Sequence, residues 1–207
     1  MKILLLGNSL KFQQIIKKIY PKSNLTNVSW REINSHIKIK TNIDYDLILV
    51  CGYDFKSGLY NKYSYLKANI VVPYMFIKKN ILSKTKIVYI NTSIEKTNYT
   101  FSRYKYAKFL LHEKLKNKFN NFYSISFNII MIDEKINIYG SFLYQGIFLI
   151  LYKFNVIKVD NEFQIIKKIK NKINKKNLDI KTLNIKPILI FIKRPLFFDR
   201  LIRLLDG

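Results

Sequence analysis

Several kinds of residue are scarce in this chain of 207 residues. A single cysteine, Cys51, leaves no disulfide within the chain, and a reducing compartment is expected. Only 6 glycines and 4 prolines are present, which excludes collagen-like and other low-complexity sequence. The hydrophobic content of 49% is nevertheless ordinary for a globular protein, and a chain of this length can bury a core without disulfides.

Long apolar runs are also missing. The first run, residues 3–6, ends at Gly7 and is too short for the core of a secretion signal. The longest uncharged run, residues 136–152, contains Asn, Gly, Ser and Gln and is too polar for a membrane span. We therefore expect a cytoplasmic protein.

Acidic residues are few, 13 against 37 Lys and Arg, and the formal net charge is +24. Such a charge suggests an anionic partner: nucleic acid, acidic lipid or a phosphorylated substrate. The lysines are, however, scattered along the whole chain, and the abundance of Lys, Ile, Asn, Tyr and Phe is typical of an AT-rich coding sequence. We attribute most of the charge to that composition and expect no specific nucleic-acid partner.

Short apolar runs alternate with amphipathic segments through most of the chain. The predicted strands are residues 2–6, 24–30, 47–51, 86–90 and 122–131. The predicted helices between them are residues 10–20, 63–79 and 103–119, with Pro73 as a point of bending. This order, with right-handed crossovers, predicts an α/β fold, a Rossmann-like doubly wound parallel sheet with helices on both faces.

The C-terminal third is less regular. We expect helices over residues 141–153, 162–176 and 195–205, and strands over residues 156–159 and 187–192. Residues 1–135 are expected to form the dinucleotide-binding core, and residues 136–207 a short part that completes the sheet and the substrate side without being an independent domain. The basic helix 162–176 and the segment 193–205 offer a peripheral contact with a membrane or a partner.

The first predicted strand is followed by Gly7-Asn8-Ser9-Leu10, where ligands of open α/β sheets bind. A helix that begins there directs backbone N–H groups toward a phosphate. A dinucleotide fingerprint needs three glycines, and only Gly7 is present, because the other two positions fall near Leu10 and Gln13. This segment fits either a degenerate cofactor-binding loop or an ordinary strand-to-helix turn.

Other residues near the predicted strand ends bear on the same site. Arg31 follows the second strand and favours a 2′-phosphate, whereas Glu32 favours ribose hydroxyls. Cys51 and Gly52 end the most apolar strand. The two histidines, His36 and His112, have no ligand spacing of a recognised form, so we expect no metal site.

Tyr104 and Lys108 are spaced i, i+4 in the predicted helix 103–119 and therefore share a face. A nearby ammonium lowers the pKa of a tyrosine, which can then pass a proton to or from a carbonyl or alcohol. Ser93, with Thr92 beside it, ends the preceding strand and could hold that oxygen.

The same spacing recurs in two other pairs, Tyr63/Lys67 and Tyr74/Lys78. With 15 tyrosines and so many lysines, about two such pairs are expected by chance, if roughly one residue in six is Lys. Context favours Tyr104/Lys108, since only that pair opens a long helix directly after a buried strand that ends in hydroxyl residues.

Taken in order, five stretches of the sequence resemble the short-chain dehydrogenase/reductases, nearest the extended branch that contains nucleotide-sugar epimerases and dehydratases. They are KILLLGN, DYDLILVCG, LKANIVVPYMFIKK, KIVYINTS and RYKYAKFLLHEKL, and they cover about residues 1–135. The chain departs from the family in its glycine-poor loop, in a short connection between Ser93 and Tyr104, and in a small C-terminal part.

The resemblance implies roles for particular residues. Tyr104 would be the acid/base, Lys108 its modulator, Ser93 the catalytic hydroxyl with Thr92 as a substitute, and Asn69 the family's structural and catalytic Asn. The cofactor, NAD or NADP, would bind at Gly7, Asn8, Ser9, Leu10, Arg31, Cys51, Gly52, Tyr104 and Lys108. We expect this binding to be weak, because a side chain at position 10 stands where pyrophosphate normally meets bare backbone.

Three functions compete at this point. The first is an NAD(P)-dependent reductase, epimerase or dehydratase that acts on a sugar or nucleotide-sugar, a kind of enzyme that the resemblance connects with polysaccharide assembly. The second is a non-catalytic relative that serves as a nucleotide-binding or structural subunit or as a regulator, and whether the chain forms an oligomer is left open. The third is a basic protein that binds nucleic acid or a membrane surface. The Ser93, Tyr104 and Lys108 set favours the first.

Overall fold

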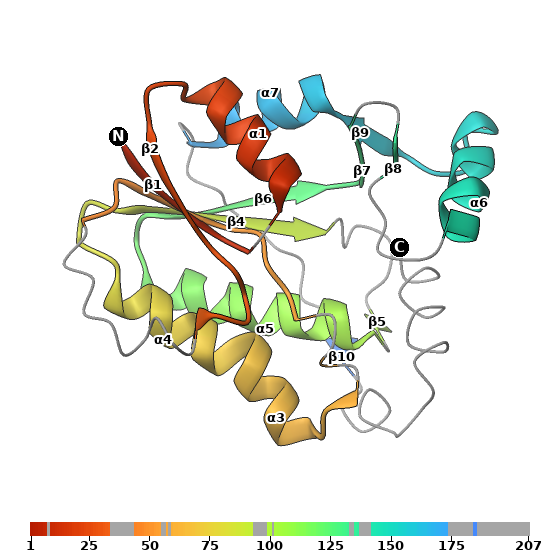
Figure 1. Ribbon diagram of the computed structural model, residues 1–207. Coiled ribbons are helices and arrows are strands. Elements are labelled where there is room, and N and C mark those ends of the chain that lie inside the picture. Colours follow the sequence, from red (N-terminus) through yellow and green to blue (C-terminus); the bar gives the residue numbers. More distant parts are fainter. Residues whose placement is uncertain are drawn as a thin grey trace.

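The main sheet has five parallel strands in the order β2-β1-β3-β4-β6 (Figure 1). The strands are β1 (Lys2–Leu6), β2 (Asn24–Val28), β3 (Leu47–Val50), β4 (Lys86–Thr92) and β6 (Phe122–Phe127). This computed structural model describes residues 1–7, 9–33, 44–54, 57, 59–92, 99–100, 102–132, 135–136, 142–173 and 184–185. The predicted parallel sheet is confirmed.

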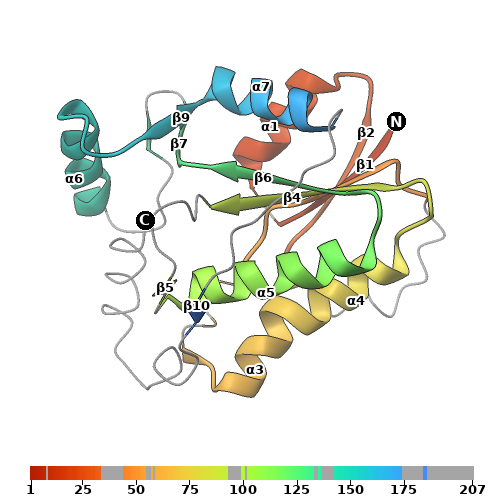
Figure 2. The same cartoon turned by 180° about the vertical axis from the view of Figure 1, so that it is seen from behind.

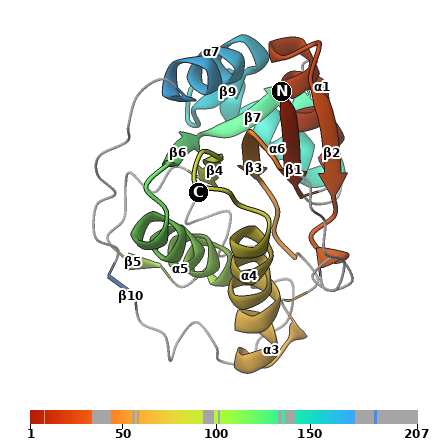
Figure 3. The ribbon, with the colours of Figure 1, turned by 90° about the vertical axis from the view of Figure 1, so that its left-hand side faces the viewer.

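Helices cover both faces of the sheet, as the doubly wound fold requires (Figures 1, 2 and 3). One face carries α1 (Leu10–Ile19) and α7 (Glu162–Ile173), and the other carries α3 (Lys62–Leu66), α4 (Val72–Lys79) and α5 (Arg103–Lys118). Successive strand residues point to opposite faces. Leu4, Leu6, Ile48 and Val50 therefore pack with α4 and α5, and Ile3, Leu5, Leu47 and Leu49 pack with α1 and α7.

The predicted helix 63–79 is interrupted by a wider turn. Between α3 and α4, the segment η2 (Lys67–Val71) has π-helical hydrogen bonding and leads directly into Pro73. Proline lacks an N–H and its ring would clash with the carbonyl four residues earlier in a regular α-helix. A single π-helical turn within an α-helix accommodates the missing hydrogen bond of the proline, and Asn69 lies in this turn.

The prediction of one strand over residues 122–131 is wrong. The chain leaves the main sheet after β6, and β7 (Ile129–Ile132) joins β8 (Lys135–Ile136) and β9 (Val159–Asn161) in a second, small sheet. At the junction, the buried Asp160 carboxylate accepts a hydrogen bond of 2.7 Å from the Asn128 N–H and pairs with Lys168 at 2.7 Å. Asp160 thus holds the chain at the point where it departs.

The C-terminal part begins with α6 (Phe142–Lys153). Two further short strands, β5 (Tyr99–Thr100) and β10 (Asn184–Ile185), pair with each other in parallel. The predicted strand 187–192 and helix 195–205 lie outside the described residues, as does the basic segment 193–205.

Helix α7 has the amphipathic character that its sequence indicates, but its apolar side is buried. Ile165, Ile169 and Ile173 pack in the core with β-strand residues and with α1. The apolar side of this helix is therefore not available to a membrane, and contact through its basic side stays a prediction.

Candidate functional site

The carboxyl ends of the five strands form one edge of the sheet, which we call the carboxyl edge. Leu6 pairs with Val50, and Val50 with Tyr89, so β1 and β3 end side by side and β4 continues beyond them to Thr92. The backbones meet closely there, since a Cβ on Gly7 would lie 2.5 Å from the Gly52 Cα. The expected neighbours Gly7 and Gly52 are thus brought together. Ser93 follows the last residue of β4 but lies outside the described residues.

The first turn presents a helix N-terminus at the carboxyl edge. Gly7 has a φ of +118°, which L side chains rarely adopt, and its N–H donates to the Val28 carbonyl at 2.9 Å. Ser9 caps α1 through its hydroxyl, which accepts a hydrogen bond from the Phe12 N–H. Leu10 is 71% exposed, so its side chain is turned to solvent. Asn8 lies outside the described residues.

Trp30 closes the neighbouring part of the edge. Its ring lies against Gly52, because a Cβ there would be 2.1 Å from the Trp30 Cε3 atom, and its indole N–H donates to the Ala68 carbonyl at 3.2 Å. Sequence reasoning missed this contact. A local signal for the turn was available: Ser29 and Glu32 exchange side-chain-to-backbone hydrogen bonds, as the spacing S-x-x-E indicates.

Arg31 extends from this turn toward the segment after β3. Its Nε lies 3.3 Å from the buried Asp54 carboxylate, and its side chain is 54% exposed. The guanidinium is therefore oriented by one carboxylate and still accessible from solvent.

Tyr104 and Lys108 lie in the first turns of α5, which Ser102 caps by accepting a hydrogen bond from the Lys105 N–H. The Lys108 Nζ is 5.9 Å from the centre of the Tyr104 ring, and it donates to the Ile90 carbonyl in β4 at 3.2 Å. The ammonium thus lies over the Tyr104 ring and nearer still to the Tyr89 ring, whose centre is 5.0 Å away, and its action on the Tyr104 hydroxyl stays a prediction. The partner hydroxyl is not shown, since only the backbone of Thr92 is described.

The electrostatics of this edge depend on a buried cation. Burial lowers the pKa of Lys108 to about 8, so its ammonium persists at neutral pH. Cys51 lies close by, and burial raises the pKa of its thiol to about 12 although the Lys108 charge acts in the opposite direction. The protonated thiol faces the Leu6 and Gly7 carbonyls, each at 3.5 Å. At neutral pH the Lys108 ammonium is therefore charged, whereas the Cys51 thiol is protonated.

A chain of tyrosines that the sequence did not reveal supports Tyr104. The Tyr53 ring meets the Tyr104 ring edge to face, with centres 4.8 Å apart. The Tyr53 and Tyr65 hydroxyls share a hydrogen bond of 2.9 Å, and the Tyr65 hydroxyl also donates to the Arg103 carbonyl. These contacts tie the start of α5 to α3 and to the segment after β3.

Asn69 is buried, and its side chain bonds within the protein. Its Oδ1 accepts from the Asp54 N–H at 2.9 Å, and its Nδ2 donates to the Ser57 Oγ at 2.8 Å and to the Tyr65 carbonyl at 3.2 Å. Asn69 therefore fixes the segment that carries Tyr53 and Asp54. A catalytic role for it stays a prediction.

Comparisons with solved structures identify the fold. The chain matches dTDP-4-dehydrorhamnose reductase from Bacillus anthracis str. Ames in complex with NADP at a TM-score of 0.59 and 12% identity, over 84% of this chain and 71% of that one. It matches L-threonine dehydrogenase from Phytophthora infestans at a TM-score of 0.56 and 14% identity, over 86% and 73%. The chain therefore shares the Rossmann-like α/β fold of these two structures.

A third solved structure is similar over part of its length. The capsular polysaccharide assembling protein CapF from Staphylococcus aureus matches at a TM-score of 0.52 and 15% identity, over 90% of this chain and 53% of that one. No protein-family model matches the chain. No curated protein matches it in sequence either.

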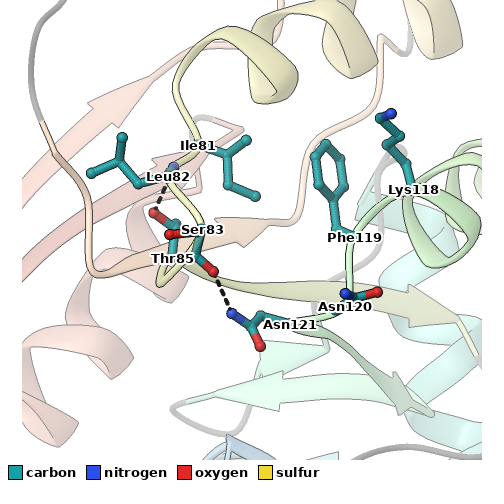
Figure 4. A pocket seen from close by; sticks show the side chains of 8 residues that line it. All are labelled: Ile81, Leu82, Ser83, Thr85, Lys118, Phe119, Asn120 and Asn121. Carbon is teal, nitrogen blue, oxygen red and sulfur yellow. Dashed lines mark hydrogen bonds between the residues drawn. The ribbon is translucent and has the colours of Figure 1, made fainter.

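A hollow of about 270 Å³ lies at the opposite edge of the sheet (Figure 4). It is formed by the loop after α4 and the turn between α5 and β6, and its lining residues are Ile81, Leu82, Ser83, Thr85, Lys118, Phe119, Asn120 and Asn121. Much of its polar lining is internally bonded, as in the hydrogen bond of 2.8 Å from the Asn121 Nδ2 to the Ser83 carbonyl. Because ligands of this fold bind at the carboxyl edge, the hollow is not the candidate site.

His112 lies further along α5, enclosed by Tyr89 and Phe122 and 3.1 Å from the Glu113 carboxylate. Burial lowers the pKa of this imidazole from 6.5 to about 4, against the opposing effect of Glu113. The unfolded chain therefore binds a proton at His112 that the folded chain does not, and stability falls as the pH drops from 6.5 toward 4.

We expect the wild type to lose about 2 kcal/mol more stability than His112→Gln on acidification across that range. Urea unfolding at a series of pH values measures the difference, and the carboxylates that do not contact His112 cancel between the two proteins. Parallel stability profiles for the two proteins would show that His112 is not held neutral by the fold.

Proposed function

We propose that this chain is an NAD(P)-dependent oxidoreductase that acts on a sugar, most specifically a nucleotide-linked keto sugar. The observation that carries the proposal is the Lys108 ammonium, buried beside Tyr104 at the carboxyl edge of the sheet. The names of the similar structures, a dehydrorhamnose reductase with NADP and a capsular polysaccharide assembling protein, support a sugar as the substrate class.

The residues at the carboxyl edge suit a dinucleotide. The N-terminus of α1 offers backbone N–H groups to a pyrophosphate next to Gly7 and Ser9, and the outward Leu10 leaves that approach open. Cys51 and Gly52 would lie beside the cofactor. Arg31 would meet a 2′-phosphate, because its guanidinium is accessible and oriented by Asp54. Lys108 would bond the ribose hydroxyls.

The proposed chemistry is the reduction of a carbonyl. The cofactor supplies a hydride to the carbonyl carbon when it is bound. Tyr104 gives its phenolic proton to the carbonyl oxygen, so that an alcohol forms and a phenolate remains. The Lys108 ammonium stabilises that phenolate, and its pKa of about 8 keeps it charged at neutral pH. Ser93 or Thr92 would hold the reacting oxygen.

Cofactor binding tests the proposal before any substrate is known. We expect NADPH to bind the wild type and to bind Arg31→Ala about tenfold more weakly, because a charge-assisted hydrogen bond to phosphate is lost. NADH should bind both proteins alike. Fluorescence titration of reduced nicotinamide measures the affinities, at low and high salt.

Lys84→Ala is the matched control, since it removes one exposed lysine from the opposite edge of the sheet. An equal loss of NADPH affinity in Lys84→Ala would mean that only the net charge matters. If neither nucleotide binds the wild type at any salt concentration, the non-catalytic alternative replaces the enzyme. Turnover is then tested with a panel of nucleotide-linked keto sugars, dTDP-4-dehydrorhamnose among them.

A further inference from the structure

Helix α6 exposes a stripe of apolar side chains. Ile147, Ile150 and Phe154 recur at i, i+3 and i+7 and therefore lie along one side of the helix axis. Their exposed fractions are 52%, 56% and 76%. Phe148, which points elsewhere on the helix, is only 8% exposed. The helix thus packs one side on the protein and turns another apolar side to solvent.

The turn after α6 is locked and extends this stripe. Asn155 adopts a left-handed conformation with a φ of 55°, and the Val156 N–H donates to the Leu151 carbonyl at 2.9 Å. The Asn155 N–H also donates to the Tyr152 carbonyl at 2.9 Å, which completes a Schellman motif. Val156 is 65% exposed. We call Ile147, Ile150, Phe154 and Val156 the α6 face.

Positive charge accompanies the α6 face. Lys153 and Lys158 flank Val156 and are both exposed. Residues 142–173 contain six lysines and two acidic residues. Both acidic residues already contact lysines, Asp160 with Lys168 and Glu162 with Lys18. Lys153 and Lys158 therefore place positive charge beside the α6 face.

We propose that the α6 face docks on the surface of an anionic lipid membrane. Exposed aromatic and aliphatic side chains beside lysines are the features that bind a helix to the interface of such a membrane. A second copy of the chain is the less suitable occupant, because a net charge of +24 on each copy opposes self-association. The inference does not depend on the proposed activity.

The helix lies on the membrane in this proposal and does not cross it. Twelve residues of α-helix reach about 18 Å, whereas the hydrocarbon core is about 30 Å thick. Among the described residues, no helix combines the length and the hydropathy of a membrane span. Figures 1 and 2 show α6 at one end of the molecule, beyond the carboxyl ends of β4 and β6.

Vesicle co-sedimentation tests the proposal. The full chain should bind vesicles of phosphatidylcholine that contain about one third phosphatidylglycerol and bind pure phosphatidylcholine far less. Ile150→Gln together with Phe154→Gln should weaken binding to the anionic vesicles by about tenfold or more, because two apolar side chains that would enter the membrane interface are lost. Lys153→Gln together with Lys158→Gln should weaken it about tenfold or more.

Met75→Gln is the control, since Met75 is 41% exposed on α4, which covers one face of the sheet away from α6. This variant should bind as the wild type does. Binding that survives the Ile150→Gln and Phe154→Gln changes would overturn the proposal, since the scattered lysines alone would then be responsible. Absence of binding to the anionic vesicles would also overturn it, as would a wild-type dimer that these two changes convert to a monomer in sedimentation.

Discussion

Gly7→Ala is expected to destabilise the protein by about 4 kcal/mol or more. Two effects act together: the φ of +118° strains any residue with a Cβ, and the added Cβ would meet the Gly52 backbone at 2.5 Å. Backbone atoms in adjoining strand ends cannot rotate aside as a flexible side chain can. The strands β1 and β3 would have to separate at the carboxyl edge. Chemical unfolding monitored by circular dichroism measures the loss.

Gly146→Ala provides the control for that experiment. Gly146 lies in α6, and a Cβ added there would find no atom within 4 Å. An alanine inside a helix should stabilise the protein by about 0.5–1 kcal/mol relative to glycine. If Gly7→Ala unfolds at the same denaturant concentration as the wild type, the close approach of Gly7 to Gly52 is not a feature of the folded protein.

Tyr104→Phe is expected to lower kcat by about 10²- to 10⁴-fold, because the variant lacks the phenolic proton that general acid catalysis requires. The Phe ring preserves the edge-to-face contact with Tyr53 at 4.8 Å, so the fold and the affinity for NADPH should hardly change. Single-turnover oxidation of NADPH, with the keto sugar that the wild type reduces fastest, measures the effect.

Tyr74→Phe is the matched control, because Tyr74 and Lys78 have the same i, i+4 spacing on α4. Its ring packs near Phe119, with centres 6.4 Å apart, at the far end of the helices. This variant should retain full activity. A Tyr104→Phe protein that binds NADPH and turns over at the wild-type rate would remove Tyr104 from the proposed mechanism.

The sheet could be predicted from sequence because its signals are local. Strand β3 is a continuous apolar run (Leu47–Val50), because helices cover both faces of the sheet at this strand. The departure of the chain after β6 could not be predicted in the same way. It depends on Asp160, which lies 32 residues from Asn128. Nothing in the sequence around Asp160 indicates that Asn128 is its hydrogen-bond partner.

The same difference between local signals and contacts of distant segments applies to the candidate site. Tyr104 and Lys108 are one helical turn apart, so their spacing alone places them on a common face. The contacts among Tyr53, Tyr65 and Tyr104 join three separate segments, and with 15 tyrosines in the chain no spacing singles these out. The cap formed by Ser29 and Glu32 was visible as a local motif and could have been predicted.

The contact between Trp30 and Gly52 ties together two positions that are distant in the sequence. The indole occupies the space in which any side chain at position 52 would have to lie, and its N–H is engaged by the Ala68 carbonyl. A larger residue at position 52 is acceptable only with a smaller one at position 30, and a smaller residue at position 30 alone leaves a void beside Gly52. In this chain, a substitution at either position is therefore expected to be tolerated only with a compensating change at the other.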